Sequence, residues 1–193
     1  MESGQVFDGN CQIYRANPDT LGDGDQSEDQ LPVFRMKPSS VLRNVVLRDS
    51  AANGIHVYGV AKMEDVHWLD VGEDALTMKA PGTMHVDCGS ATLGADKVFQ
   101  VNQPSTLHIE NFHASDSGKF MRQNGGTDFP VRALIDHCDI SNMRVGIFTT
   151  DGANSYVSLT HSLYSEMDDL FFFEGVGFSS DSAQSCVYNS TEY

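Results

Sequence analysis

The sequence predicts an all-β fold, a right-handed parallel β-helix, and three observations lead to this class. Short apolar runs recur at an interval of roughly 21 to 25 residues from about residue 40 onward. The runs alternate apolar and polar residues as strands do, and no helical 3.6-residue stripe fits between them. Gly, Asn and Asp join the runs, whereas the leucine pattern of a leucine-rich horseshoe is missing. The right-handed sense follows the usual rule for parallel crossovers.

Each repeat contains two apolar runs. The first runs of successive units lie at residues 42–45, 63–66, 84–87 and 107–111, and the second at 54–57, 74–77, 97–100 and 119–121. Looser units begin near residues 133 and 157. A polar column is expected to stack at one corner of the coil, formed by Asn44, Asp65, Asp87, Asn111 and Asp136.

The length of 193 residues favours a single domain over residues 1–193 that can bury a core of its own. Residues 1–30 are rich in Asp, Gly, Asn and Gln, and we expect an irregular N-terminal cap there. The coils are expected over residues 31–180, followed by a C-terminal tail at 181–193.

Composition excludes several classes of partner. Because 27 acidic residues face 12 basic ones, for a net charge of −15, the chain lacks the basic footprint that nucleic acid requires. No apolar run is long enough to span a membrane, and no signal peptide is visible.

The four cysteines form no CxxC pair, so a zinc site built on them is not expected, and both disulfides and free thiols stay open. We expect a monomer.

Cations recur at matched positions of the repeat. Adjacent coils of a β-helix lie about 4.8 Å apart, so residues one period apart become neighbours in space. Asn53, Asp74, Lys97 and Lys119 hold closely similar positions and should form a strip that is acidic at one end and cationic at the other. The sequence therefore predicts a site in which carboxylates hold a metal and cations hold an acidic substrate.

Several ordered motifs make the chain resemble the small β-helical pectate lyases of polysaccharide lyase family 3, including the subgroup attached to harpin-type proteins. The motifs are Phe-Asp-Gly at 7–9, Ser-Glu at 27–28, Leu-Arg-Asn-Val at 42–45, Gly-Ile-His at 54–56, the segments 68–75 and 96–102, and Asp-Ser-Gly-Lys-Phe-Met-Arg at 116–122. They cover roughly residues 7–150. The resemblance implies a secreted enzyme that cleaves de-esterified homogalacturonan (pectate) by calcium-assisted β-elimination.

The resemblance also implies roles for individual residues. The family's acidic calcium cluster falls on Glu73 and Asp74, with Glu28 close by, and the position that is usually acidic before Gly-Ile-His is Asn53. The family's catalytic lysine matches Lys97. Its substrate-binding cations match Lys79, Lys119 and Arg122, and Arg122 is placed with Lys97 as a catalytic group.

The chemistry requires these residue types. Ca²⁺ takes oxygen ligands and acts as a Lewis acid on the sugar carboxylate, while a neutral lysine removes the C5 proton. Lys119, Arg122 and calcium should lower the pKa of Lys97, whereas Asp74 and Asp96 should raise it. An alkaline activity optimum follows if the lowering is incomplete.

An alternative function remains open. Asn53 replaces a charged ligand by a neutral one, and positions that hold cysteines in other members are here Val57 and Gly72. These departures, with the acidic charge, favour a non-catalytic pectate-binding module of a secreted protein that targets plant cell walls. The base Lys97 favours the enzyme, because binding alone does not need it. A third interpretation, an interaction solenoid unrelated to sugar, would not explain the cationic strip.

Overall fold

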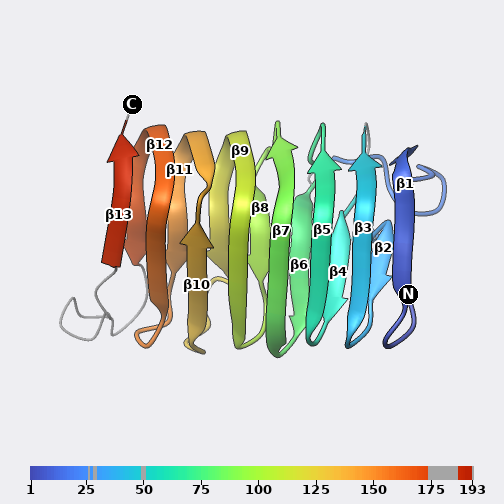
Figure 1. Ribbon diagram of the computed structural model, residues 1–193, viewed down its shortest axis with the longest axis horizontal. Coiled ribbons are helices and arrows are strands. Elements are labelled where there is room, and N and C mark those ends of the chain that lie inside the picture. The colour runs from blue at the N-terminus through green and yellow to red at the C-terminus, as the bar shows by residue number, and fades with distance from the viewer. Residues whose placement is uncertain (26, 28–29, 49–50, 174–186, 193) are drawn as a thin grey trace.

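The computed structural model describes residues 1–25, 27, 30–48, 51–173 and 187–192, and its regular secondary structure there is entirely β (Figure 1). The strands are β1 (Val6–Tyr14), β2 (Phe34–Met36), β3 (Ser40–Leu47), β4 (Ile55–Tyr58), β5 (Ala61–Trp68), β6 (Asp74–Ala80), β7 (Gly82–Thr92), β8 (Lys97–Val101), β9 (Ser105–Gln123), β10 (Val131–Asp136), β11 (Asp139–Thr150), β12 (Tyr156–Phe173) and β13 (Val187–Glu192). They follow one another along the long axis, with β1 at one end and β13 at the other.

Successive coils pair in parallel and in register, which confirms the predicted parallel β-helix. Strand β3 pairs with β5, β5 with β7 and β7 with β9, whereas β4, β6, β8 and the end of β9 form a separate parallel series. Each coil therefore has three faces. The first two are the halves of β3, β5 and β7 on either side of a corner, and the third contains β2, β4, β6, β8 and the C-terminal parts of β9 and β11. The right-handed sense stays a prediction.

Alternation of the side chains fills the coil with stacked apolar rows. One row runs through six neighbouring coils, and its members are at most 2 % exposed: Leu42, Met63, Val86, Ile109, Ile135 and Leu159. On the third face, Leu76, Phe99 and Met121 are likewise in register and fully buried. Burial of these rows removes apolar surface from water and supplies the main stabilisation of the coil.

The corner between the first two faces is made by one residue per coil in the left-handed conformation. The pairing registers align Asn44, Asp65, Cys88, Asn111, His137 and His161, all with φ between 48° and 62°. The predicted polar column was correct for three members but wrong for Asp87 and Asp136, each of which precedes the corner by one residue. The sequence was misleading because Cys88 and His137 hold the corner, and each directly follows an Asp, a residue type that is itself common in this conformation.

The N-terminal cap was predicted wrongly. Residues 6–14 are not irregular but form β1, which pairs in parallel with β3 and makes the first coil. The Asp, Gly and Asn residues that indicated a loop instead turn the corner: Asn10 and Cys11 have positive φ. Gly9 is required there, since a Cβ atom would lie 2.5 Å from the Asn44 carbonyl oxygen.

The C-terminal tail needs a similar correction. Residues 187–192 form β13 and pair in parallel with β12, so the strand series extends past residue 180. Residues 181–186 and 193 lie outside the described residues, as does Cys186. The three described cysteines are free thiols; Cys138 is buried, and Cys11 and Cys88 are exposed. Within the described residues, no helix is long and apolar enough to cross a membrane.

Candidate functional site

The predicted strip forms on the third face. Asp74 at the start of β6 is in register with Lys97 at the start of β8, and Lys97 is in register with Lys119 on β9. Asn53 lies one coil before Asp74, because the next residues of its coil pair Ile55 with Leu76. The repeat interval of the sequence therefore correctly predicted which residues would be neighbours.

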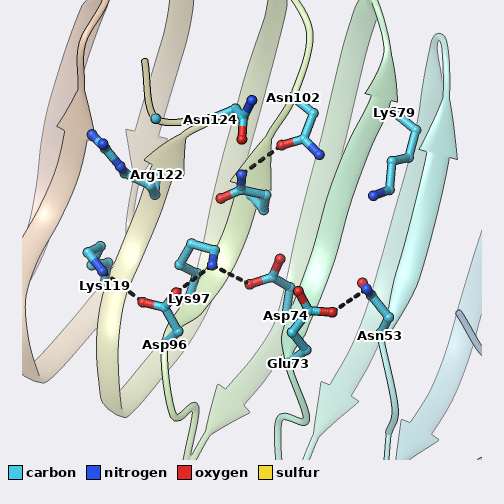
Figure 2. Close-up of a pocket in the computed structure, with 12 residues that line it drawn as sticks. Asn53, Glu73, Asp74, Lys79, Asp96, Lys97, Asn102, Lys119, Arg122 and Asn124 are labelled. Carbon is cyan, nitrogen blue, oxygen red and sulfur yellow. Dashed lines mark hydrogen bonds and ion pairs between the residues drawn. The ribbon is translucent and has the colours of Figure 1, made fainter. Parts of the chain in front are cut away.

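A polar cleft of about 210 Å³ lies over this strip (Figure 2). The cleft contains every predicted site residue that belongs to the described part of the chain. Glu28 is not among the described residues, so its predicted role stays a prediction. Its walls carry almost only polar groups, contributed by Asn53, Glu73, Asp74, Lys79, Asp96, Lys97, Gln100, Asn102, Lys119, Arg122, Asn124 and Gly125.

Lys97 is held between two carboxylates. Its ammonium lies 2.5 Å from Asp96 Oδ2 and 3.3 Å from Asp74 Oδ1, and only 12 % of its side chain is exposed. Burial acts to lower the pKa of Lys97, but the charge of Asp74 and the hydrogen bond and charge of Asp96 outweigh burial, so the pKa lies above its ordinary value. The raising influence that the sequence predicted for Asp74 and Asp96 therefore outweighs the effect of burial on the pKa of Lys97.

Asp96 links the two lysines of the strip. Its other oxygen, Oδ1, accepts a hydrogen bond of 2.7 Å from Lys119. Burial acts to raise the pKa of Asp96, yet the hydrogen bonds and charges of Lys119 and Lys97 hold it below its ordinary value. Asp96 thus stays ionised and fixes the position of both ammonium groups.

The acidic end of the cleft contains buried oxygen-bearing side chains. Glu73 and Asp74 are 5 % and 3 % exposed, and Asn53 lies beside them. The Asn53 amide donates to the Glu73 carboxylate (Figure 2), and its carbonyl oxygen lies 2.9 Å from His56 Nε2. Burial, with the nearby Lys79 and Arg35, lowers the pKa of His56 to about 4, so this histidine is neutral at neutral pH.

This donor set fits a calcium ion. Two adjacent buried carboxylates supply hard, charged oxygen ligands of the kind that Ca²⁺ prefers. Burying them together is costly without a compensating cation. Lys97 compensates Asp74 in part, and a bound divalent cation would compensate both carboxylates.

Arg122 is positioned by a residue that the sequence reasoning missed. Its guanidinium lies 2.8 Å from Asp151 Oδ1, and the backbone N–H of Gly126 donates to Asp151 Oδ2 over 2.6 Å. Asp151 is only 10 % exposed. It therefore joins Arg122 to the loop that borders the cleft.

Neutral amides in the cleft were also missed. Gln100 is in register with Arg122 and donates to Asn102 Oδ1 over 2.7 Å, and Asn124 lines the same cleft. Amides give no charge signal in a sequence. The register could have found Gln100, because positions 100 and 122 are each three residues after a lysine of the strip.

Comparison with known proteins agrees with this fold and site. A family model described as pectate lyase matches residues 1–176. The chain belongs to the pectate lyase family.

Individual relatives are fungal and bacterial proteins. Pectate lyase H of Emericella nidulans is 35 % identical over 136 residues, which are 69 % of this chain and 52 % of that protein. Pectate lyase E of the same organism is 33 % identical over 122 residues, 62 % of this chain and 48 % of that protein. The chain thus spans about half the length of the curated relatives it matches.

A solved structure shares the fold. The crystal structure of the catalytic domain of pectate lyase PelI from Erwinia chrysanthemi superposes with a TM-score of 0.72 at 19 % identity. The match covers 99 % of this chain and 84 % of that one.

Proposed function

We propose that this chain is a calcium-dependent pectate lyase that cleaves de-esterified homogalacturonan by β-elimination, with Lys97 as the base. The observation that carries the proposal is the register of Asp74, Lys97 and Lys119, which places one lysine between an acidic and a cationic end of a single cleft. Because its substrate is a wall polymer, the protein is expected to act outside the cell.

The reaction assigns a task to each group. The neutral amine of Lys97 takes the C5 proton of a galacturonate unit, the C4–O bond breaks, and a double bond forms between C4 and C5. The departing oxygen takes a proton from water. Arg122 suits a bidentate grip on a sugar carboxylate beside the reacting carbon, and Lys79 and Lys119 hold further carboxylates as point charges.

Glu73, Asp74 and Asn53 are the residues that would hold calcium, together with Glu28 as the resemblance implies. When bound, the ion supplies Lewis-acid stabilisation of negative charge on the substrate carboxylate. The chain's own contribution is to keep these oxygen ligands buried and close to Lys97.

The pH dependence follows from the raised pKa of Lys97. A group with a raised pKa is protonated over a wider range, so the fraction of neutral base is small at neutral pH and grows as the pH rises. Cleavage is therefore expected to increase toward alkaline pH.

The test is the ultraviolet absorbance of polygalacturonate incubated with the protein at alkaline pH. The unsaturated product absorbs, so we expect a steady rise with calcium and none after a chelator is added. A rise that the chelator leaves unchanged would contradict calcium dependence.

The alternative is a non-catalytic pectate-binding module, favoured by one observation: Asn53 stands at a position where the resemblance implies a carboxylate. This module would retain the protein on immobilised pectate in a pull-down but give no absorbance rise. Such a result would replace the lyase proposal.

A further inference from the structure

A second group of potential ligands lies away from the cleft, at the corner between the first two faces. Asp136 ends β10, His137 follows it, and His161 lies on β12, the strand that pairs with β10. Their ligand atoms lie within 4.8 Å of one another, and within the described residues they are the only such group of three. The cleft contains none of these residues.

The corner conformation explains why the two histidines meet. His137 and His161 hold equivalent corner positions in adjacent coils, with φ of 51° and 48°. Their rings are stacked, with centroids 4.9 Å apart and planes 25° from parallel. Both rings therefore turn the same nitrogen, Nδ1, toward one carboxylate.

Asp136 bridges the two rings. Its Oδ2 lies 2.9 Å from His137 Nδ1, and its Oδ1 lies 2.8 Å from His161 Nδ1. The Thr160 hydroxyl also donates to Oδ1, over 2.7 Å, which fixes the orientation of the carboxylate. Three ligand groups thus converge and are already held by the fold.

The geometry points to a site for a divalent transition metal of the zinc type, bound by Nδ1 of His137, Nδ1 of His161 and the Asp136 carboxylate. Two imidazole nitrogens and one carboxylate suit zinc, whereas calcium prefers oxygen ligands alone. Metal–nitrogen bonds of about 2.0–2.1 Å keep two ligand nitrogens within about 4.2 Å of each other. Two rings that are more than half exposed reach that separation by a small shift.

The surrounding charge supports a cation. Glu110 is in register with Asp136 one coil earlier, and Asp87 is in register with Glu110 one coil before that, so carboxylates follow one another along this edge. Coordination through Nδ1 leaves the ring proton on Nε2. The metal would join the coils of β10 and β12, which predicts a stabilising effect that is independent of the proposed lyase activity.

The test is a calorimetric titration with zinc chloride in excess calcium, so that the cleft is occupied. Replacing the two exposed cysteines by serine removes competing thiols. We expect one zinc per chain and an affinity about tenfold or more weaker in His137→Ala and in His161→Ala. His85→Ala is the matched control, because His85 stacks on His108 in the same way, at 4.6 Å, outside the three-ligand group.

Thermal unfolding gives a second measurement. Zinc should raise the Tm of the protein with Cys11 and Cys88 replaced by serine, and of its His85→Ala variant, and should leave the Tm of its His161→Ala variant unchanged. Asp136→Asn serves as a second variant in case an alanine variant does not fold, because it keeps the shape of the side chain. Zinc should not raise the Tm of Asp136→Asn either. Absence of binding heat at sub-millimolar zinc, or equal affinity in His161→Ala and His85→Ala, would overturn the proposal.

Discussion

The surroundings of Lys97 have opposite effects on the pKa of its amine. Its burial favours the neutral amine, whereas Asp74 and Asp96 favour the ammonium, and the carboxylates dominate. A surface lysine without these contacts would have neither a fixed position nor a neighbouring acidic pair. The contacts therefore suit a base that works at alkaline pH.

Replacing Lys97 tests its role as the base. We expect Lys97→Ala to lower kcat by roughly 10²- to 10⁴-fold, the usual contribution of a positioned general base. Calcium affinity, measured by calorimetry, should be preserved, because Glu73 and Asp74 remain. Lys62→Ala is the control, since Lys62 pairs with Glu64 outside the cleft. Full activity of Lys97→Ala would remove Lys97 as the base.

The pH profile of cleavage should respond to Asp96. Asp96→Asn removes a negative charge 2.5 Å from the Lys97 ammonium, which lowers the pKa of Lys97. More of the amine is then neutral at a given pH, so the rising limb of kcat against pH should move to lower pH. Glu64→Gln, a carboxylate outside the cleft, should leave the limb in place. An unmoved limb in Asp96→Asn would show that Lys97 does not set the pH dependence.

Asn53 determines the charge of the acidic end. In the structure it presents its amide NH₂ group, rather than an oxygen, to Glu73. Asn53→Asp would add a charged oxygen ligand, so calorimetry should detect tighter calcium binding. The added repulsion should also lower the Tm in chelator. Unchanged calcium affinity would place position 53 outside the metal site.

At the residue scale the sequence predicted which charged residues lie together in the cleft, whereas their roles stay predictions, and it missed the residues that support them. Lys97, Lys119 and Asp74 could be found because charged residues repeat at one period in the regular coils. Asp151 could not, because it lies in the looser units after residue 130, where the period is hard to follow. Gln100 and Asn102 carry no charge, so the periodic pattern of charges did not mark them, and Gln100 could be found only through its register with Arg122.

The strands show where composition is ambiguous in a β-helix. Asp, Gly and Asn usually indicate loops, yet in β1 they turn a corner inside a continuous nine-residue strand. The same ambiguity displaced the predicted corner column by one residue at Cys88. Apolar alternation predicts the flat faces reliably because burial enforces it, whereas a corner depends on backbone conformation, which several residue types can adopt.

Asp151 connects the loop after β9 to Arg122. Asp151→Asn weakens both the ion pair to Arg122 and the bond from the Gly126 N–H, so Arg122 loses its fixed orientation. We expect KM for polygalacturonate to rise several-fold with a smaller change in kcat. Asp128→Asn, an exposed carboxylate in the same loop, should behave as the unmodified protein. A lower KM in Asp151→Asn would contradict the positioning role, since it would mean that Asp151 competes with substrate for Arg122.

The whole molecule carries a net charge of −15, yet its proposed substrate is a polyanion. The cleft is locally rich in positive charge, which suits a polyanion. Four of the chain's 12 basic residues line it: Lys79, Lys97, Lys119 and Arg122. Exposed charges beyond about 10 Å are largely screened at 0.1 M salt, so the local cations govern contact. The acidic remainder of the surface instead favours cations.

Calcium should stabilise the folded protein, and this effect can be measured by thermal unfolding. A ligand that binds only the folded state at a concentration 100 times its Kd stabilises by about 2.7 kcal/mol. For a chain of this length, that should raise Tm by about 5–10 °C. Magnesium at the same concentration measures the general screening of the net charge, so the specific effect is the difference between the two ions. Glu73→Gln should abolish that difference and Glu64→Gln should keep it; equal shifts with both ions in the unmodified protein would mean that Glu73 and Asp74 form no calcium site.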